Sequence, residues 1–285
     1  MGIWALKKVV VVSDKKSLAD IEKLSRSIQN YGITLCILPW IKNIDLQKEE
    51  GTLFVTDQTE IAAAMIVNGL PVLGCLTKSN RNAFFGGVKF LVIAEDELEP
   101  EYLERVYRRY CNLPWELLIT ERCLIRETIE ADIDEFYEIY AHPSITRYTE
   151  NLFPDREKER LYVTNYRKNV YEFYEYGIWT VVSKQTGKVI GRAGLTMREG
   201  FMEPELGFII GASWQREGYA YEVCMSILSY GFKELGFQKV QAFTQPQNTA
   251  SLGLMHKLGF QPVGSHVING IEHIRLEKDM DSLYT

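Results

Sequence analysis

The chain has 285 residues, of which 46% are hydrophobic, so it is long enough and apolar enough to bury a core in each of two domains. Its formal net charge is −6 and it contains no run of Lys or Arg, which argues against binding along a nucleic-acid backbone. A cationic or small-molecule partner suits this charge better.

The five cysteines are odd in number and widely spaced, and no two of them form a Cys-x-x-Cys pair. The pattern predicts neither a disulfide framework nor a zinc site, and it suits a reducing cytosol. No apolar run reaches the roughly 18 residues that a membrane helix needs, and no basic-then-apolar leader opens the chain. We therefore expect a cytoplasmic protein. The cysteines are Cys36, Cys75, Cys111, Cys123 and Cys224.

The first part of the chain alternates short strands rich in Val, Ile and Leu with helical patterns. Such alternation predicts an α/β domain, at residues 1–112, whose mostly parallel sheet is covered on both faces. The expected elements are strand Lys8–Ser13, helix Ser17–Asn30, strands Ile33–Leu38 and Thr52–Val55, helix Thr59–Asn68, strands Val72–Cys75 and Val88–Ile93, and helix Pro100–Arg109.

The segment Leu113-Pro114-Trp115 marks the expected boundary, and a second domain is expected at residues 118–285. Adjacent strands joined by a turn at Gly187 indicate antiparallel pairing, so this domain is predicted to be α+β with a mixed, mostly antiparallel sheet. The expected elements are strand Glu121–Arg126, helices Ala131–Tyr140 and Arg156–Tyr174, strands Ile178–Ser183, Val189–Thr196 and Glu205–Ile210, helix Tyr219–Leu235, strand Lys239–Thr244, helix Ser251–Lys257, and a closing pair around Val263 and Ile271–Glu277.

A tight glycine turn connects a predicted strand to a predicted helix in the second domain. Its sequence, Gln215-Arg216-Glu217-Gly218-Tyr219-Ala220, follows strand Glu205–Ile210 and opens helix Tyr219–Leu235. Gly218 permits backbone dihedrals that a side chain disfavours, and the small Ala220 lets a ligand approach the backbone. The free N–H groups of a helix's first turn point at an anion, so the pattern predicts a phosphate site.

A second pattern follows about thirty residues later, where Asn248-Thr249-Ala250-Ser251 opens a short helix that ends in Leu258-Gly259-Phe260. Coenzyme A presents a diphosphate, a 3′-phosphate and a pantetheine arm whose amides need strand-like backbone partners. The strand at Phe208–Ile210 can pair with that arm, while the glycine turn and the positive helix end hold the diphosphate. The two patterns together favour coenzyme A as the ligand.

With these motifs, residues from about 119 to 280 resemble the GNAT superfamily of acyl-CoA N-acyltransferases, and most of all its ribosomal-protein N-terminal acetyltransferase subgroup. The resemblance rests on Glu205-Leu206-Gly207-Phe208, on the glycine turn continued by Tyr221-Glu222, and on Asn248-Thr249-Ala250-Ser251 with Lys257-Leu258-Gly259-Phe260. It implies a GNAT fold and transfer of an acetyl group from acetyl-CoA to a primary amine, either a protein N-terminus or a small amine.

The resemblance also implies which residues hold the cosubstrate. Glu217 departs from the family, because many relatives carry Lys or Arg at this position. A carboxylate beside a diphosphate weakens binding through like-charge repulsion unless it points to solvent. The implied cofactor-binding residues are Phe208, Ile209, Ile210, Gln215, Arg216, Glu217, Gly218, Tyr219, Ala220, Asn248 and Ser251.

The implied reaction needs an amine that has lost its proton and a thiolate that gains one, and it passes through an oxyanion that a backbone N–H can stabilise. An α-amino group with a pKa near 8 is neutral in roughly one molecule in ten at pH 7, against about one in 2,500 for lysine. An α-amine therefore needs less help from a base to lose its proton. Glu205, which begins the cofactor strand, is the first candidate for a base that acts through water, and Glu272 is the second.

Ser251 is a candidate donor of a hydrogen bond to the departing sulfur, as the subgroup resemblance implies. Many relatives place a tyrosine farther along this helix, where residues 254–256 are Leu, Met and His. Structural alternatives remain for these positions: Glu205 as a solvated strand-end carboxylate, and Ser251 and Asn248 as helix-capping residues.

Aromatic residues crowd the segment at 162–179, which borders the acceptor site in relatives. Most of them are expected to pack in the core, while Trp179 and Tyr174 are candidates for lining the acceptor pocket. Because Glu217 and the missing tyrosine both count against catalysis, a second hypothesis is a binding protein for which acetyl-CoA is a signal.

The first domain carries a fainter pattern. Val10–Asp14 ends a strand with an acid, and Phe54–Glu60 followed by Gly69–Gly74 resembles the later motif of haloacid-dehalogenase-like phosphatases. Those enzymes need a second aspartate two residues after the nucleophile, and Lys16 occupies that position. We expect a degenerate, non-catalytic relative or an unrelated doubly wound domain, used for packing or ligand sensing. A phosphatase, the remaining alternative, would have to work without that aspartate.

Overall fold

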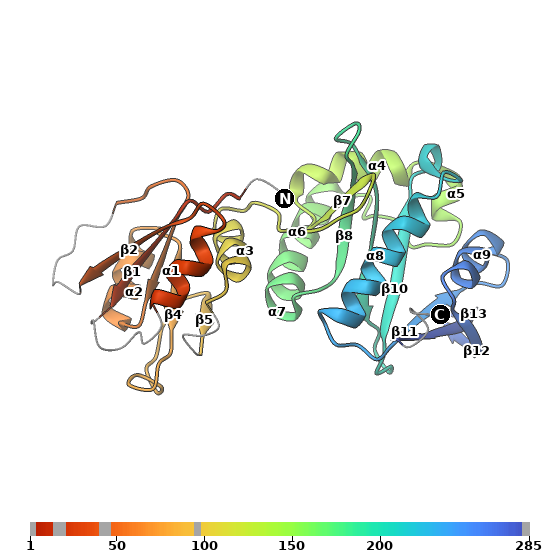
Figure 1. Cartoon of the computed structure of the whole chain (residues 1–285). Coiled ribbons are helices and arrows are strands. Elements are labelled where there is room, and N and C mark those ends of the chain that lie inside the picture. The colour runs from red at the N-terminus through yellow and green to blue at the C-terminus, as the bar shows by residue number, and fades with distance from the viewer. Residues whose placement is uncertain (1–3, 14–20, 40–46, 94–97, 281–285) are drawn as a thin grey trace. The chain divides into compact units, whose positions relative to one another are not determined.

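The computed structural model describes residues 4–13, 21–39, 47–93 and 98–280. The chain divides into two compact units, Met1–Trp115 and Glu116–Thr285 (Figure 1). Among the described helices, none combines the length and the apolar character needed to cross a membrane.

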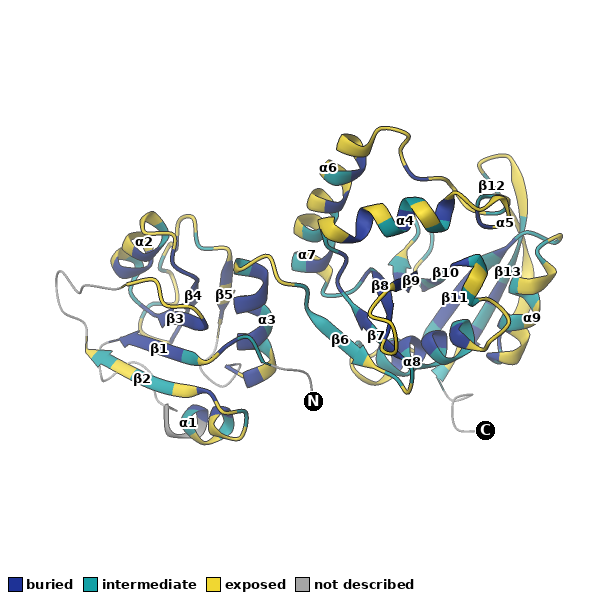
Figure 2. Cartoon of the chain, turned by 90° about the horizontal axis from the view of Figure 1, so that it is seen from above, coloured by how far each residue is buried: buried dark blue, intermediate teal, exposed yellow. Residues whose placement is uncertain are grey.

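The first unit is built on a five-stranded sheet in which every neighbouring pair of strands is parallel. Its elements are β1 (Lys8–Ser13), α1 (Ile21–Gln29), β2 (Thr34–Pro39), β3 (Thr52–Thr56), α2 (Thr59–Val67), β4 (Val72–Cys75), β5 (Phe90–Val92) and α3 (Pro100–Tyr110). The strand order is β2-β1-β3-β4-β5. Helices α1 and α3 cover one face of the sheet and α2 covers the other (Figure 2).

Strand β1 shows why both faces are covered. Val9 and Val11 pack in the core under α1 and α3, while Val10 and Val12 pack in the core under α2, and none of the four is more than 4% exposed. A strand buried on both faces reads as a continuous apolar run, as Lys8–Ser13 does. The predicted α/β class of this half of the chain is confirmed.

The second unit contains an eight-stranded mixed sheet of order β12-β13-β11-β10-β9-β8-β7-β6. Its elements are β6 (Glu116–Ile119), β7 (Cys123–Arg126), α4 (Ile133–Tyr140), α5 (Pro143–Thr146), α6 (Arg156–Tyr166), α7 (Glu172–Tyr174), β8 (Ile178–Ser183), β9 (Val189–Met197), β10 (Pro204–Ile210), α8 (Tyr219–Lys233), β11 (Lys239–Thr244), α9 (Thr249–Lys257), β12 (Gln261–Ile268) and β13 (Ile271–Asp279). Neighbouring strands are antiparallel, except that β10 and β11 are parallel. The predicted mixed, mostly antiparallel sheet is confirmed.

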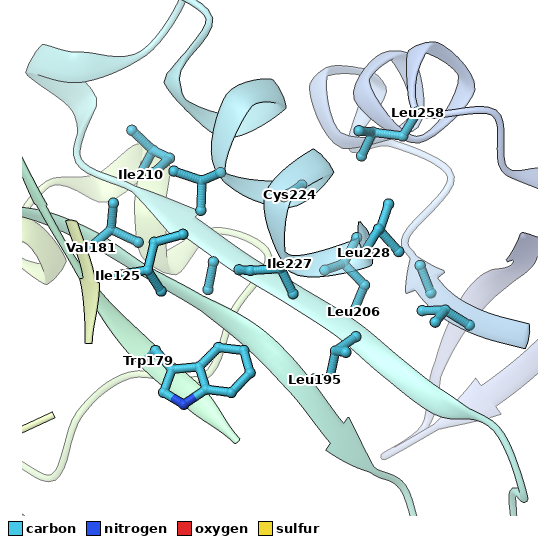
Figure 3. Packing of buried hydrophobic residues seen from close by; sticks show 14 of the residues in the cluster. Ile125, Trp179, Val181, Leu195, Leu206, Ile210, Cys224, Ile227, Leu228 and Leu258 are labelled. Carbon is cyan, nitrogen blue, oxygen red and sulfur yellow. The ribbon is translucent and has the colours of Figure 1, made fainter. Parts of the chain in front are cut away.

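Helix α8 packs on one face of this sheet, and α4 and α6 lie on the other (Figure 2). Figure 3 shows Ile227 and Leu228 of α8 beside Leu195 and Leu206 of the sheet, and all four side chains are almost completely buried. Burying one such side chain contributes about 1.5–3 kcal/mol relative to leaving it in water. This packing fixes where the first turn of α8 lies against the end of β10.

Three elements differ from the sequence prediction, and one of them is helix α5, which is additional. Strand Glu116–Ile119 is additional, and it leaves Glu121 and Arg122 in a turn instead of at the start of a strand. The helix predicted over Arg156–Tyr174 is interrupted by a π-helical turn at Arg167–Tyr171. A π turn holds more residues than an α turn, and here it ends on the fully buried Tyr171, whose hydroxyl donates to the carbonyl of Ile178.

Candidate active site

Strands β10 and β11 meet at one point and then separate. β10 pairs with β9 along its whole length, but within the described residues its pairing with β11 consists of Glu205 opposite Gln241 alone. Beyond that pair, the two strands run apart (Figure 1). The free edge runs along Phe208–Ile210, so it can offer backbone hydrogen bonds to an extended ligand that contains amides.

The loop at residues 215–218 follows this strand and leads into α8. Gly218 has φ +87° and Arg216 has φ +67°, so two of its four residues are left-handed. Backbones of this kind form concave nests of N–H groups that bind anions. All four residues are exposed, and the Gln215 side-chain amide donates to the carbonyl of Ile210 at 2.9 Å. The predicted phosphate loop thus lies at the open edge of β10.

The turn between β6 and β7 contacts this loop. The Arg122 Nη1 donates to the carbonyl of Glu217 at 2.9 Å, and the Arg122 guanidinium lies 4.2 Å from the ring centre of Tyr219. Glu217 itself is exposed, which meets the condition under which its charge is tolerated. The positive charge of Arg122, a residue outside the glycine motif, therefore lies beside the loop.

Glu222, in the first turn of α8, holds the same turn in place. Its carboxylate accepts from the Thr120 hydroxyl at 2.6 Å, from the Arg122 backbone N–H at 2.8 Å and from the Arg122 Nε at 2.7 Å. Partial burial of Glu222 raises its pKa, but the hydrogen bonds from Thr120 and Arg122 outweigh burial, so its pKa is lowered from the usual 4.5.

This lowered pKa gives a first prediction. A carboxyl whose pKa is lower in the folded state stabilises the fold above its unfolded pKa, and the stabilisation is lost as the pH falls through the folded value. We expect Glu222→Gln to lower the free energy of unfolding by about 1–2 kcal/mol at pH 7. Urea unfolding at several pH values checks this: the gap between variant and wild type should shrink below about pH 4, and a gap that grows there would contradict it.

Helix α9 presents the second motif, and one of the two capping alternatives, Asn248, is visible. The Asn248 Oδ1 accepts from the backbone N–H of Ser251 at 3.2 Å, so Asn248 caps the helix. The hydroxyl of Ser251 lies 3.2 Å from the hydroxyl of Thr244, at the end of β11. These bonds occupy the Asn248 carbonyl oxygen and leave its amide N–H groups available to a ligand. The cofactor role of Asn248 and the proton-donor role of Ser251 stay predictions.

A cavity of about 540 Å³ lies beside the fork of β10 and β11. Its wall comes from the connection between β9 and β10 and from the hairpin of β12 and β13. Glu205 lies in this wall and forms a two-point ion pair with Arg198, whose Nε and Nη2 approach its carboxylate oxygens at 2.5 and 3.0 Å. The lining residues are Thr196, Met197, Arg198, Glu199, Phe201, Glu205, Val267, Ile268 and Asn269.

The two candidate bases differ in their surroundings. Glu205 has a side chain that is 13% exposed, whereas Glu272 is exposed near the tip of the β12–β13 hairpin, opposite the lining residue Val267. Gln241, which pairs with Glu205 across the fork, is fully buried, and its Oε1 has no hydrogen-bond partner among the described residues. That oxygen is a polar acceptor next to the fork which sequence inspection did not single out.

The aromatic candidates lie away from this cavity. Trp179 is 1% exposed and packs edge-on against Tyr230 of α8, so its ring belongs to the core and offers no surface to an acceptor (Figure 3). Tyr174 is 51% exposed and contacts Phe173 and Tyr176. Neither residue lines the cavity.

In the first unit, polar residues follow the ends of adjacent strands. Thr56, the last residue of β3, and Asp57, which follows it, are buried. The Asn80 amide donates to the carbonyls of Asp57 at 2.7 Å and Cys75 at 3.0 Å. Asp14 and Lys16, on which the phosphatase comparison depends, lie outside the described residues. The haloacid-dehalogenase-like resemblance and the non-catalytic role stay predictions.

Comparison with known families decides what the second unit is. A family model described as an acetyltransferase (GNAT) domain matches residues 122–261, which include β10, the loop at 215–218, α8 and α9. Residues 122–261 form a GNAT acetyltransferase domain. The predicted enzyme class is confirmed: this domain transfers an acetyl group from acetyl-CoA to an amine.

Curated relatives match about half of this chain. The uncharacterized N-acetyltransferase p20 of Bacillus licheniformis is 27% identical over 156 residues, which cover 52% of this chain and 84% of that protein. The [ribosomal protein uS5]-alanine N-acetyltransferase of Escherichia coli is 24% identical over 161 residues, covering 54% of this chain and 82% of the relative.

Solved structures show the same fold. A GNAT-family acetyltransferase from Bacillus anthracis superposes with a TM-score of 0.50 at 23% identity, covering 57% of this chain and 98% of that structure. The ribosomal-protein-S5-alanine acetyltransferase of Vibrio fischeri also has a TM-score of 0.50, at 19% identity, and covers 58% of this chain and 97% of its own.

The residues of the GNAT domain fit acetyl-CoA. A Cβ on Gly218 would lie 3.4 Å from the Arg122 Nη2, which is an ordinary contact, so it is the φ of +87° that favours glycine at this position. The loop offers N–H groups to a diphosphate, and the free edge of β10 offers backbone groups to the pantetheine amides. Two charged residues at the site, Arg122 and Arg198, were missed in the sequence. Arg198 could have been found from its place one residue beyond the end of β9 and seven positions before Glu205, whereas Arg122 has no local signal.

Proposed function

We propose that the GNAT domain acetylates the α-amine of a polypeptide chain. The observation that carries this proposal is the ion pair between Glu205 and Arg198 in the wall of the cavity. Acetyl-CoA supplies the acetyl group as a thioester, and the residues of the chain bind it, orient the amine and accept the amine's proton. We also propose domain limits at 1–112 and 118–285.

The ion pair fixes the position of the Glu205 carboxylate in the wall of the cavity, because Arg198 contacts both of its oxygens. Each carboxylate oxygen still has a second lone pair, with which it can orient a water toward the amine. Proton removal through an oriented water suits an amine that already loses its proton near neutral pH. The α-amine, with a pKa of about 8, meets this requirement and the lysine side chain does not.

The cavity also suits a polypeptide end. Met197 is 45% exposed and Val267 is 73% exposed, so the cavity opens to solvent through apolar side chains. Met202, in the connection between β9 and β10, is 89% exposed. Apolar surface at a cavity mouth can contact the side chains that follow the first residue of a peptide. The similarity to an alanine N-acetyltransferase of a ribosomal protein supports the same acceptor class.

The remaining assignments follow from this placement. We propose that the free edge at Phe208–Ile210 binds the pantetheine arm and that the loop at 215–218 binds the diphosphate. Ser251 is proposed to donate a hydrogen bond to the departing sulfur after its hydroxyl rotates away from the hydroxyl of Thr244. Because all five cysteines are free thiols, we propose that the protein works in the reducing cytoplasm.

A panel of three acceptors tests the acceptor class. The panel comprises a peptide with a free alanine N-terminus, the same peptide with an acetylated N-terminus and one lysine, and a polyamine. At pH 7 we expect thiol release with the first to exceed release with the second by at least about 100-fold, because the neutral fractions of the two amines differ by more than that. The ratio should narrow toward pH 10. Faster turnover of lysine or of the polyamine would contradict the proposal.

A further inference from the structure

We propose that Arg122, from the turn between β6 and β7, is a positioning residue for acetyl-CoA, because it fixes the backbone of the loop that holds the diphosphate. Arg122 lies outside the glycine motif and is separated from Glu217 by 95 positions in the sequence. The inference rests on the proposed function only in placing the diphosphate at the loop of residues 215–218. It does not depend on which amine is the acceptor.

The loop needs external support because its backbone is strained. Arg216 has a φ of +67°. A left-handed conformation of this kind costs an L-residue roughly 1–2 kcal/mol. Strain of this size persists where surrounding contacts impose it, and such sites are often functional. The loop is held at both ends: the Gln215 side chain binds the carbonyl of Ile210, and Arg122 binds the carbonyl of Glu217, both at 2.9 Å.

The bond to Glu217 determines where the next N–H points. In a trans peptide the carbonyl of one residue and the N–H of the next point in opposite directions. When Arg122 holds the carbonyl of Glu217 on its side of the loop, the N–H of Gly218 points away from Arg122 and is kept from rotating. A fixed N–H binds an anion more tightly than a mobile one, because no ordering entropy is lost on binding.

Arg122 can do this because its own position is fixed. Glu222 binds both the backbone N–H and the Nε of Arg122, at 2.8 and 2.7 Å, so the side chain leaves the turn in one direction. The Arg122 side chain keeps 37% of its surface exposed, and its positive charge lies beside a loop that carries the exposed Glu217. The planar fork of arginine allows one side chain to reach two acceptors, Glu222 and the carbonyl of Glu217.

Two acetyl donors test the role of Arg122. Acetyl-CoA contains the diphosphate, and acetyl-pantetheine carries the same thioester without it. We expect Arg122→Gln to raise the KM for acetyl-CoA and its Kd about tenfold, the loss of one charge-assisted hydrogen-bonded contact. The kcat at saturating acetyl-CoA and the kcat/KM for acetyl-pantetheine should stay within about twofold of wild type. An equal loss with both donors, or no loss with either, would overturn the proposal.

Lys184 provides a matched control. Its Nζ donates to the carbonyls of Thr120 and Glu121, so it supports the same turn with the same charge, and its hydrogen bonds in the described structure do not reach the loop. Lys184→Met should leave the Kd for acetyl-CoA unchanged, whereas a tenfold weakening would show that charge or turn stability alone is responsible.

The variant Arg122→Lys keeps the positive charge at this position but loses the planar fork that orients the loop backbone. A single ammonium cannot bridge Glu222 and the carbonyl of Glu217, so we expect it to restore less than half of the lost binding free energy. Full recovery with lysine would overturn a positioning role. Kd values are measured by calorimetry without any amine, so an error in the proposed acceptor leaves this result unaffected. Failure of wild-type protein to bind acetyl-CoA would instead count against the placement of the cosubstrate.

Discussion

Gly218→Trp is expected to weaken acetyl-CoA binding by at least about 100-fold, which corresponds to roughly 3 kcal/mol. Gly218 is the N-cap of α8 with φ +87°, and a Cβ there would point toward Arg122. An indole in this position meets the Arg122 guanidinium, and a side chain at this φ strains the backbone, so the loop whose N–H groups face the diphosphate is displaced. Calorimetry with acetyl-CoA measures the effect directly.

The control for this variant is a second left-handed glycine. Gly187 has φ +69° in the turn between β8 and β9, and a Cβ there would meet no atom within 4 Å. Gly187→Trp introduces the same side chain and comparable backbone strain in open space, so it should lower the melting temperature while acetyl-CoA affinity is retained. If Gly218→Trp also retained that affinity, the diphosphate site would have to lie elsewhere.

Glu205→Gln is expected to lower kcat about 100-fold at pH 7 while the Kd for acetyl-CoA changes little, since general-base catalysis typically contributes at least this factor. The amide is close to the carboxylate in shape but cannot accept a proton from the amine. As the pH rises, the acceptor loses its proton without help, so the rate of the variant should approach that of wild type. A pH–rate profile of kcat from pH 6 to pH 10 measures this.

Two companion variants separate the possible causes of such a loss. Glu272→Gln changes the other candidate base, and a larger loss there than in Glu205→Gln would transfer the role to Glu272. Arg198→Gln breaks the same ion pair but keeps the Glu205 carboxylate. If Arg198→Gln lost activity to the same extent and with the same pH profile as Glu205→Gln, the ion pair and not the base would be responsible.

The parts of the fold that the sequence predicted best are those with strong local patterns. Strands Lys8–Ser13, Val72–Cys75, Ile178–Ser183 and Lys239–Thr244 occur with the predicted bounds. Each is a short run rich in β-branched or otherwise apolar residues and bounded by turn residues, so neighbours in the chain suffice to define it. The glycine turn before α8 belongs to the same class, because a left-handed residue and a helix start are local properties.

Strand Glu116–Ile119 and the π-helical turn at Arg167–Tyr171 were not predicted. Each depends on a partner elsewhere: the strand on its pairing with β7, and the turn on a buried contact between Tyr171 and Ile178. The placement of Trp179 has the same origin. An aromatic residue next to an expected acceptor site fits either a pocket or a core, and only the packing of α8 on the sheet decides for the core.

The sequence by itself determined the class of the second unit and the position of the glycine loop that we propose binds the diphosphate, because three short motifs carry that information in their local order. The tertiary structure decided which charges surround the site. Arg122 contacts the loop although it lies 95 positions away in the sequence, and Arg198 contacts both carboxylate oxygens of Glu205. Gln241 pairs with Glu205 at the point where β10 and β11 separate. Contacts between residues far apart in the chain depend on the packing of whole elements, which no local pattern specifies.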